Sequence, residues 1–235
     1  MGVILMTKHF WIVGTDTDVG KTLVTTYFMR YFQTKGVTAI PYKPIQTGIM
    51  VENTRQFYGD TEFYKSFSEE VLVEEQLNSY SFKKPASPHY AAMLEGAVID
   101  EAVILQHIKQ LITLYDHVIC EGAGGLYVPL NEQGNYHFLE LIKQSQLPVV
   151  LVTRTKLGTI NHTFLSLEAL KMWEIPIVGI VFNGGEGTEL EENNIRTIGQ
   201  STDLPTLVIP RLNDLSDLKN IQIPNTEFLE RLSSI

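Results

Sequence analysis

A glycine-rich loop near the start of the chain constrains the fold more than any other feature of the sequence. It reads Gly14-Thr-Asp-Thr-Asp-Val-Gly-Lys-Thr22, follows the apolar run Phe10–Val13 and precedes an amphipathic stretch that Gly36 ends. A loop between a strand and a helix offers a phosphate backbone N–H groups and the positive end of the helix dipole. The pattern predicts a phosphate site in which Lys21 reaches the outer phosphates and the Thr22 hydroxyl binds Mg²⁺.

The spacing inside this loop departs from the usual one. Five residues separate Gly14 from Gly20, which is one more than in the common G-x-x-x-x-G-K loop. The competing interpretation is an ordinary glycine-containing turn that carries a surface lysine. The sequence Gly-Lys-Thr at the junction of a strand and a helix favours the phosphate site, because an anion can be held there by the helix N-terminus.

Five further runs of apolar, often β-branched residues recur along the chain, with amphipathic stretches between them. They are Thr38–Tyr42, His117–Cys120, Val149–Thr153, Ile177–Phe182 and Thr206–Ile209. Because these runs are continuously apolar and do not alternate, we expect strands that are buried on both faces, as in a parallel sheet. The sequence therefore predicts an α/β fold with a mostly parallel central sheet and helices on both of its faces.

Several stretches between the runs have helical periodicity. Asp100 can cap a helix in which apolar residues between positions 103 and 112 share one face. Shorter helices are expected at Phe138–Gln144, Phe164–Trp173 and Leu190–Ile198. Residues 45–88 are the least regular part, and we expect them to form helices and loops around a site. No linker or repeat divides the chain, so residues 1–235 are predicted to be a single domain.

Composition and charge exclude several classes of protein. The chain has 18 Lys and Arg against 27 Asp and Glu, a net charge of −9, which argues against partners such as nucleic acid or an anionic membrane. Cys120 is the only cysteine, so an intramolecular disulfide and a cysteine-rich zinc site are excluded. The apolar start is too short for a signal peptide, and no apolar run approaches the ~20 residues that span a bilayer. We expect a cytoplasmic protein.

Two acidic residues are candidates for holding a metal against bound phosphate. Glu121 ends the apolar run His117–Cys120 and precedes the turn Gly122-Ala-Gly-Gly125, whose glycines would let the backbone approach a ligand closely. A Mg²⁺–nucleotide site usually needs such a carboxylate at the end of a central strand. Asp60 is the second candidate. The competing interpretations are a solvated strand end for Glu121 and a helix cap for Asp60.

A second lysine stands where the next strand ends, in Tyr42-Lys-Pro-Ile-Gln-Thr-Gly48. Ligands of open parallel sheets lie beyond the carboxyl ends of the strands, which is where Lys43 and Thr47 fall. Pro44 favours an extended Lys43 and so directs its ammonium towards the site. The alternative interpretation is a lone surface lysine. The turn at residues 84–89 has polar tips, and its composition indicates a loop rather than a site.

Five motifs resemble those of the dethiobiotin synthetase family, in the same order and with compatible spacing from about Phe10 to about Leu212. They are Gly14–Thr22, Tyr42–Gly48, Ser87–His89, Glu121–Gly125 and Lys156–His162. The resemblance implies a P-loop NTPase-like domain and an ATP-dependent cyclo-ligase with Mg²⁺ as cofactor. Such an enzyme forms a carbamate from 7,8-diaminopelargonate and CO₂ and phosphorylates it with ATP to a mixed anhydride. It then closes the ureido ring of dethiobiotin and releases ADP and phosphate.

The resemblance also implies roles for individual side chains. Lys21 and Lys43 would be the catalytic residues, one on either side of the transferring phosphoryl group, where negative charge concentrates. Thr47 would bind the substrate near its nitrogen or carbamate end. The side chains implied to hold Mg²⁺ are those of Thr22, Asp60 and Glu121. The phosphorylation supplies a leaving group that a carbamate lacks, so the protein mainly positions groups and neutralises charge.

A larger set of residues is implied to surround the nucleotide, with the adenine beside Asn183 and residues 210–212. This set consists of Asp18, Val19, Gly20, Lys21, Thr22, Leu23, Asp60, Glu121, Gly122, Ala123, Gly124, Asn183, Gly184, Pro210, Arg211 and Leu212. The loop Lys156–His162 resembles the part that reaches the substrate tail across a dimer interface. The resemblance therefore implies a homodimer whose substrate site lies at that interface.

Three positions depart from the family pattern. Thr47 stands where a serine is common, so the hydroxyl is kept and an added methyl narrows the pocket. Asp18 replaces a common glutamate and keeps its charge on a shorter arm. Gly184 stands where an acid is common, which puts the selectivity for adenine in question.

Two other classes of P-loop protein compete with this interpretation. A switch or partitioning ATPase often carries an additional lysine early in the loop, where this chain has Thr15 and Asp16. The ATP domain of a cobyric-acid-type amidotransferase has a related loop, but that activity needs a glutaminase domain with a nucleophilic cysteine. A non-catalytic nucleotide-binding subunit is a third alternative, although it does not explain Lys43 and Thr47. Phosphate release that depends on the diamine would separate a synthetase from all three.

Overall fold

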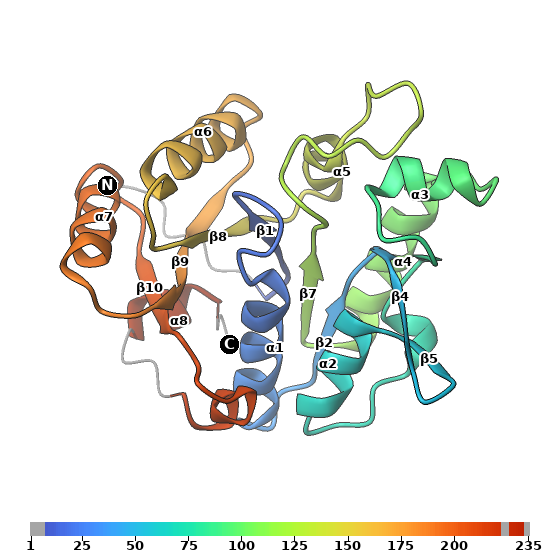
Figure 1. The fold of residues 1–235 in the computed structure, drawn as a ribbon, viewed down its shortest axis with the longest axis horizontal. Coiled ribbons are helices and arrows are strands. Elements are labelled where there is room, and N and C mark those ends of the chain that lie inside the picture. The colour runs from blue at the N-terminus through green and yellow to red at the C-terminus, as the bar shows by residue number, and fades with distance from the viewer. Residues whose placement is uncertain (1–7, 222–225, 233–235) are drawn as a thin grey trace.

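The computed structural model describes residues 8–221 and 226–232. Its centre is a six-stranded sheet with the order β10-β9-β8-β1-β7-β2, in which every neighbouring pair is parallel (Figure 1). The strands are β1 (Phe10–Gly14), β2 (Ala39–Tyr42), β7 (His117–Glu121), β8 (Val149–Arg154), β9 (Ile177–Gly185) and β10 (Thr206–Pro210). The six apolar runs of the sequence form these six strands, which confirms that prediction.

Helices cover both faces of the sheet, as predicted (Figure 1). One face is covered by α1 (Lys21–Gln33) and α8 (Thr226–Leu232). The other is covered by α4 (Glu101–Leu114), α5 (Phe138–Ser145), α6 (Thr159–Met172) and α7 (Glu189–Gln200). A short 3-10 helix, Leu215–Asn220, follows β10. The fold class expected from the sequence is therefore confirmed.

Burial on both faces explains why the strands are apolar throughout. Successive residues of β1 point to opposite sides of the sheet. Phe10 packs edge-on against Phe28 of α1 with ring centroids 5.8 Å apart, whereas Trp11 packs against Phe138 of α5 at 6.4 Å. Burial of an apolar side chain of this kind stabilises the fold by ~1.5–3 kcal/mol. The sheet is thus a rigid support for the loops at the carboxyl ends of its strands.

The predicted helices are present, with one large difference in where a helix begins. Asp100 caps α4, and its carboxylate accepts a 2.8 Å bond from the N–H of Ala102. By contrast, α6 begins at Thr159, earlier than the apolar pattern indicates. The hydroxyls of Thr159 and Thr163 lie 2.8 and 2.9 Å from that of Thr153 in β8. A buried helix face made of threonine carries no apolar periodicity, so the pattern misses it.

The segment 45–88 contains more strand than expected. Its elements are β3 (Ile45–Thr47), β4 (Ile49–Glu52), β5 (Arg55–Tyr58), α2 (Gly59–Phe67), a 3-10 helix (Glu74–Gln76), β6 (Tyr80–Phe82) and, starting at its end, α3 (Pro88–Leu94). β3 pairs with β6, and β4 pairs with β5 as a hairpin. The hairpin turns at Asn53 and Thr54, whose φ angles of 46° and 72° lie in the left-handed region. These strands of three or four residues are too short to leave a periodic signal.

Candidate functional site

The glycine-rich loop joins β1, in the middle of the sheet, to the start of α1. The cap residue of α1 is Gly20, so no side chain of the described residues caps the N–H groups of the first turn. Gly20 has φ 96°, and a Cβ at this position would lie 1.9 Å from Nδ2 of Asn183. Only glycine fits there. The loop therefore presents an uncapped helix N-terminus, which is suited to an anion.

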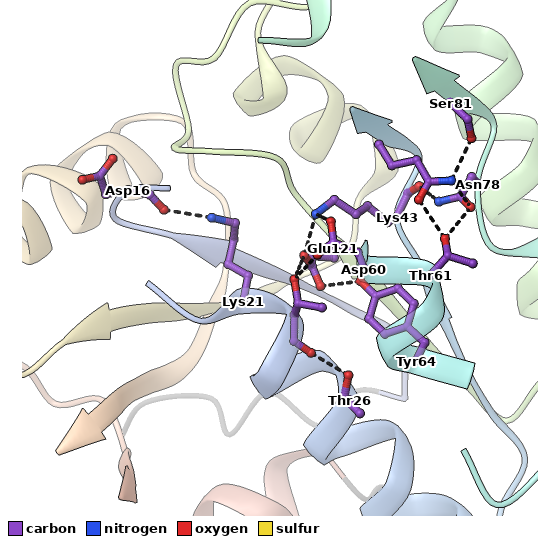
Figure 2. Close-up of polar contacts among 12 residues, drawn as sticks. Asp16, Lys21, Thr26, Lys43, Asp60, Thr61, Tyr64, Asn78, Ser81 and Glu121 are labelled. Atoms are coloured by element: carbon purple, nitrogen blue, oxygen red, sulfur yellow. Dashed lines mark hydrogen bonds and ion pairs between the residues drawn. The ribbon is translucent and has the colours of Figure 1, made fainter. Parts of the chain in front are cut away.

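Lys21 lies at this helix start with its side chain folded back along the loop (Figure 2). Its Nζ donates a 2.8 Å hydrogen bond to the backbone carbonyl of Asp16, and only 6% of the residue is exposed. Burial lowers the pKa of Lys21 to about 8, although the carboxylate of Glu121 acts in the opposite direction. A buried cation with a single carbonyl partner is poised to pair with an anion such as a phosphate.

Four side chains from separate parts of the chain meet beside Lys21. The Thr22 hydroxyl of α1 lies 2.8 Å from Oδ1 of Asp60 in α2 and 2.9 Å from Oε1 of Glu121 at the end of β7. The Lys43 Nζ, just beyond β2, lies 2.9 Å from the same Glu121 oxygen and forms an ion pair with Asp60 (Figure 2). Two carboxylates and a hydroxyl thus converge on one point, which is a donor set that Mg²⁺ prefers.

The charges at this centre stabilise one another. Burial alone would lower the pKa of Lys43, but the charges of Glu121 and Asp60 outweigh it and raise the pKa above its usual range. Burial would likewise raise the pKa of Asp60, and the charge of Lys43 outweighs it and lowers the pKa. Both groups are therefore ionised at neutral pH. Because α2 begins with Tyr58 as its cap residue, the interpretation of Asp60 as a helix cap is wrong.

A polar network holds the chain on either side of this centre. The side chain of Asn78 donates a 2.8 Å bond to the carbonyl of Lys43 and accepts one from Gln46. Thr61, next to Asp60, donates to the side-chain oxygen of Gln46 at 2.7 Å (Figure 2). The network ties the end of β2 to the start of α2. It therefore fixes the two backbones that carry the lysine and the carboxylate.

A cleft of about 720 Å³ opens over these groups. Thr47, at the end of β3, lines the cleft together with the segment 85–88, which forms the approach to α3. This segment, interpreted above as a loop without a site, thus forms one wall of the cleft. The residues along the cleft are Thr17, Asp18, Gly20, Lys21, Thr22, Lys43, Ile45, Thr47, Asp60, Pro85, Ala86, Ser87, Pro88, Glu121, Ala123, Gly124 and Val128.

A second pocket of about 370 Å³ lies on the other side of Asp18. Asn183 lines it and donates a 3.0 Å hydrogen bond from Nδ2 to the carbonyl of Val19, whereas its Oδ1 is buried and has no partner among the described residues. Gly184 lines the same pocket, with φ 79°. Arg211 contributes its guanidinium at the mouth. A buried acceptor without a donor is suited to a ligand N–H.

The remaining residues implied by the resemblance surround these two pockets without lining them. Leu23 follows Thr22 in α1, and the N–H of Gly122 donates a 3.0 Å bond to the carbonyl of Ile12. Pro210 and Leu212 flank Arg211 at the end of β10. The structure thus gathers most of the implied residues around one continuous region and leaves these four at its margin.

Sequence reasoning missed two residues in this region. Tyr64, one helical turn after Asp60, is fully buried, and its hydroxyl donates to Oε2 of Glu121 (Figure 2). Glu186 lies at the mouth of the second pocket and forms ion pairs with Lys156 and Arg211. The spacing of four residues between Asp60 and Tyr64 places them on one helix face, and this signal was available in the sequence.

Comparison with solved structures defines the fold. The septum site-determining protein MinD of Pyrococcus horikoshii, complexed with Mg-ADP, superposes with a TM-score of 0.58 at 16% identity, over 97% of this chain and 95% of that one. The signal recognition particle receptor FtsY of Elizabethkingia anophelis, in complex with GDP, gives 0.57 at 14% identity, over 97% and 64%. With its loop between β1 and α1, the chain is a P-loop protein of the α/β class.

Sequence comparison narrows this class. A family model described as an AAA domain matches residues 8–220. The ATP-dependent dethiobiotin synthetase of Lysinibacillus sphaericus strain C3-41 is 54% identical over 225 residues, 96% of each chain. The protein of that name from Halalkalibacterium halodurans is 41% identical, over 87% of this chain and 84% of its own. The chain belongs to the family of ATP-dependent dethiobiotin synthetases, as its motifs indicated.

Proposed function

We propose that this protein is an ATP-dependent ligase that forms dethiobiotin from 7,8-diaminopelargonate, CO₂ and ATP. The observation that carries the proposal is the meeting of Lys21, Lys43 and two carboxylates in a cleft that extends past Thr47. A nucleotide needs the loop and its lysine, whereas a second, buried lysine and a hydroxyl beyond it serve a further anionic substrate. The similarity of the chain to proteins named ATP-dependent dethiobiotin synthetase supports the same activity.

The phosphate end of the nucleotide belongs at the uncapped start of α1. There Lys21 would exchange its bond to the Asp16 carbonyl for the charge of a phosphate oxygen. Thr22, Asp60 and Glu121 fit Mg²⁺ because their oxygen atoms already converge within hydrogen-bond distance. When bound, the metal supplies positive charge against the phosphates. Mg²⁺ is thus the proposed cofactor, with ATP as co-substrate.

The reaction asks mainly for positioned charge. One amine of the diamine adds to CO₂ and loses a proton, which gives a carbamate. A carbamate oxygen attacks the γ-phosphorus, and ADP leaves with the electrons of the broken P–O bond. The second amine then attacks the carbonyl carbon and loses a proton, and phosphate leaves. Lys21 and Lys43 neutralise the charge of the transferring phosphoryl and the carbamate, and Thr47 orients the substrate by a hydrogen bond.

The second pocket suits the adenine. The unpartnered Oδ1 of Asn183 would accept a hydrogen bond from the exocyclic amine of the base. Gly184 has no side chain to add to this recognition. Arg211 lines the pocket, and Pro210 and Leu212 flank it in the chain. The backbone of Asp18, Val19 and Gly20 lies between the pocket and the cleft, where the sugar and first phosphate would pass. Leu23 and residues 122–124 complete the proposed surround.

A homodimer and a single domain complete the proposal. The segment Lys156–His162, which includes the first turn of α6, would reach the substrate tail in a second copy of the chain, and its Leu157 is 87% exposed. Leu165, further along α6, is 63% exposed, and exposed apolar residues favour a covered surface. Residues 1–235 would form one synthetase domain in the cytoplasm. Among the described residues, no helix combines the length and the apolar character needed to cross a membrane.

The decisive experiment is mass spectrometry of the product after adding 7,8-diaminopelargonate, bicarbonate, ATP and Mg²⁺. We expect dethiobiotin, with one phosphate released per ring closed. Phosphate release without the diamine, or release that follows a protein or membrane partner, would instead indicate a switch ATPase. The fold alone does not distinguish the two, because it is shared by both.

A further inference from the structure

Tyr64 makes a contact with the metal-binding candidate Glu121 that the proposed reaction does not explain. Tyr64 lies in α2, on the same helix face as Asp60, and it is fully buried. Its hydroxyl donates a hydrogen bond to Oε2 of Glu121 (Figure 2). Tyr64 does not line the cleft, so it acts on the site only through the carboxylate that it contacts.

The two oxygen atoms of Glu121 have different partners. Oε1 faces the cleft, where Thr22 and Lys43 both lie 2.9 Å away. Oε2 points away from them, and among the described residues it accepts a hydrogen bond only from Tyr64. The whole side chain is buried, so no solvent competes for this oxygen. The carboxylate is therefore held in one orientation, in which Oε2 is bonded to Tyr64 in the core and Oε1 faces the cleft.

This orientation would not be kept by the backbone alone. The last torsion of a glutamate side chain is broad, so an unrestrained carboxylate turns through a wide range. A buried oxygen without a donor costs ~1–3 kcal/mol, which would drive such a turn until Oε2 found a partner in the cleft. Tyr64 removes that tendency, because it satisfies Oε2 from behind. The partners of a metal-binding carboxylate commonly have this role.

We infer that Tyr64 is a positioning residue, whose hydroxyl fixes the Glu121 carboxylate so that Oε1 alone is presented to Mg²⁺. The inference rests on the proposed function, in which Glu121 holds the metal. It differs from a packing role, because packing depends on the ring, whereas positioning depends on the hydroxyl. Replacement of Tyr64 by phenylalanine separates the two, since only the hydroxyl is lost.

The test compares Tyr64→Phe with a matched control, Tyr42→Phe. Tyr42 is also fully buried, and its hydroxyl lies 2.6 Å from that of Ser79, outside the cleft. Calorimetry measures ADP binding with Mg²⁺ and with EDTA. We expect Tyr64→Phe to bind ADP normally in EDTA and to lose about tenfold of the affinity that Mg²⁺ adds. Tyr42→Phe should match the parent under both conditions.

Turnover gives a second readout. In Tyr64→Phe, a Mg²⁺ titration of diamine-dependent phosphate release should shift to higher Mg²⁺ concentration, and excess Mg²⁺ should restore most of the rate. An unshifted titration, a loss of ADP binding that is equal in EDTA, or the same defect in Tyr42→Phe would overturn the inference. Glu121→Gln in the same assays separates a failure of the proposed metal site from a failure of the positioning role of Tyr64. If it too leaves the Mg²⁺ dependence unchanged, the proposed metal site fails; if only Tyr64→Phe does, the positioning role alone fails.

Discussion

His117 and Glu121 lie at opposite ends of β7, and both are buried, but their surroundings differ: His117 packs against an aromatic ring, and Glu121 lies among charged groups. The ring of His117 stacks on Phe32 with centroids 3.7 Å apart, and its Nδ1 donates a 2.7 Å bond to the carbonyl of Lys8. Burial lowers the pKa of His117 to about 4, so this ring is neutral. Glu121 instead forms an ion pair with Lys43 and accepts two hydroxyl hydrogen bonds.

The difference shows that burial of His117 stabilises the fold, whereas burial of the charged groups around Glu121 prepares a site for a ligand. At the amino end of the strand, the chain avoids a buried charge and gains ordinary packing. At the carboxyl end it collects two cations and two anions, although a buried ion pair generally stabilises a fold no better than apolar side chains of the same volume. The charges at the carboxyl end are therefore explained by the anionic ligands they would bind. Changes there should alter activity, and changes at the amino end should alter stability.

The largest effect is expected from Lys21→Ala. The loop backbone would still surround a phosphate, but the charge at the transferring group would be lost, which is worth ~10²–10³ in rate. Diamine-dependent phosphate release measures this loss. Lys35→Ala, an exposed lysine just beyond α1, is the control and should behave as the parent. Activity within a few-fold of the parent in Lys21→Ala would remove the phosphate role from the loop.

Lys43→Gln should cost nearly as much turnover, but by a different route. Lys43 does not belong to the phosphate loop, so Mg-ATP binding should stay largely intact while diamine-dependent release falls by about 10². Lys43→Arg should also fail, because a guanidinium is wider than an ammonium and does not replace a point charge between two anions. The paired measurement is nucleotide affinity by calorimetry and phosphate release at saturating bicarbonate.

A switch ATPase has no need of a cation at this position, so its basal hydrolysis would hardly respond to Lys43→Gln. Normal diamine-dependent release in that variant would exclude the lysine from the mechanism. Lys43 would then have only a structural role at the carboxyl end of β7, as a buried partner of Glu121.

Glu121→Gln should weaken the dependence on Mg²⁺ more than nucleotide binding. The amide keeps the shape of the side chain but lacks the negative charge that a hard cation prefers. The shift in the Mg²⁺ titration should exceed the ~10-fold expected of a residue that only supports a metal ligand. Full burial of Glu121 already shows that the interpretation of a solvated strand end is wrong. An unchanged titration would leave Glu121 as a buried strand end without a role at the metal.

At the amino end, His117 should make the fold sensitive to acid. Its pKa is 6.5 when unfolded and about 4 when folded, so the unfolded chain binds the proton more tightly. The stability that the neutral ring contributes is fully present above pH 6.5 and is lost as the pH falls towards 4. His9, whose pKa burial also lowers, acts in the same direction. Chemical denaturation between pH 8 and 4 measures the slope.

His117→Phe isolates this contribution. The phenyl ring can keep the stack on Phe32 but binds no proton, so the loss of stability between pH 6.5 and 4 should become smaller. The variant gives up the bond to the Lys8 carbonyl, and its stability at pH 8 should fall by ~1 kcal/mol. Turnover at pH 8 should not change. A slope identical to that of the parent would show that other groups, such as His9, carry the acid sensitivity in this pH range.

The sequence predicted the sheet well because burial on both faces leaves continuous apolar runs, as in Phe10–Val13 and Val149–Thr153. It predicted the site as far as motifs reach: the loop, Lys43 and Glu121 lie at strand ends, which parallel topology gathers on one side. It could not place the start of α6, because that helix buries threonines. It also missed Tyr64. The spacing from Asp60 placed the ring on the same helix face, but no pattern in the sequence showed that its hydroxyl donates to Glu121 and not to a group of the core.

The smallest effect is expected at the base pocket, where the charges are exposed. Glu186 pairs with Lys156 and Arg211 at the mouth, and over 60% of both cationic side chains is accessible to solvent. Ion pairs of this kind contribute little to stability, so Glu186→Ala should leave the melting temperature unchanged. The change also frees Arg211 at the proposed adenine site, so KM for ATP should rise roughly a few-fold while kcat stays the same. This pattern is expected when a mutation removes a contact that binds the substrate and the transition state equally.

The preference for ATP over GTP tests the role of Glu186 more directly than KM does. Gly184 provides no acid beside Asn183, so Glu186 is the nearest carboxylate along the chain that lines the pocket. If Glu186 helps to select adenine, Glu186→Ala should narrow the preference for ATP over GTP in diamine-dependent phosphate release. An unchanged preference would assign selection to Asn183 alone. A fall in kcat instead of a rise in KM would show that the exposed ion pairs of Glu186 take part in the chemical step, as the buried charges at the end of β7 are expected to do.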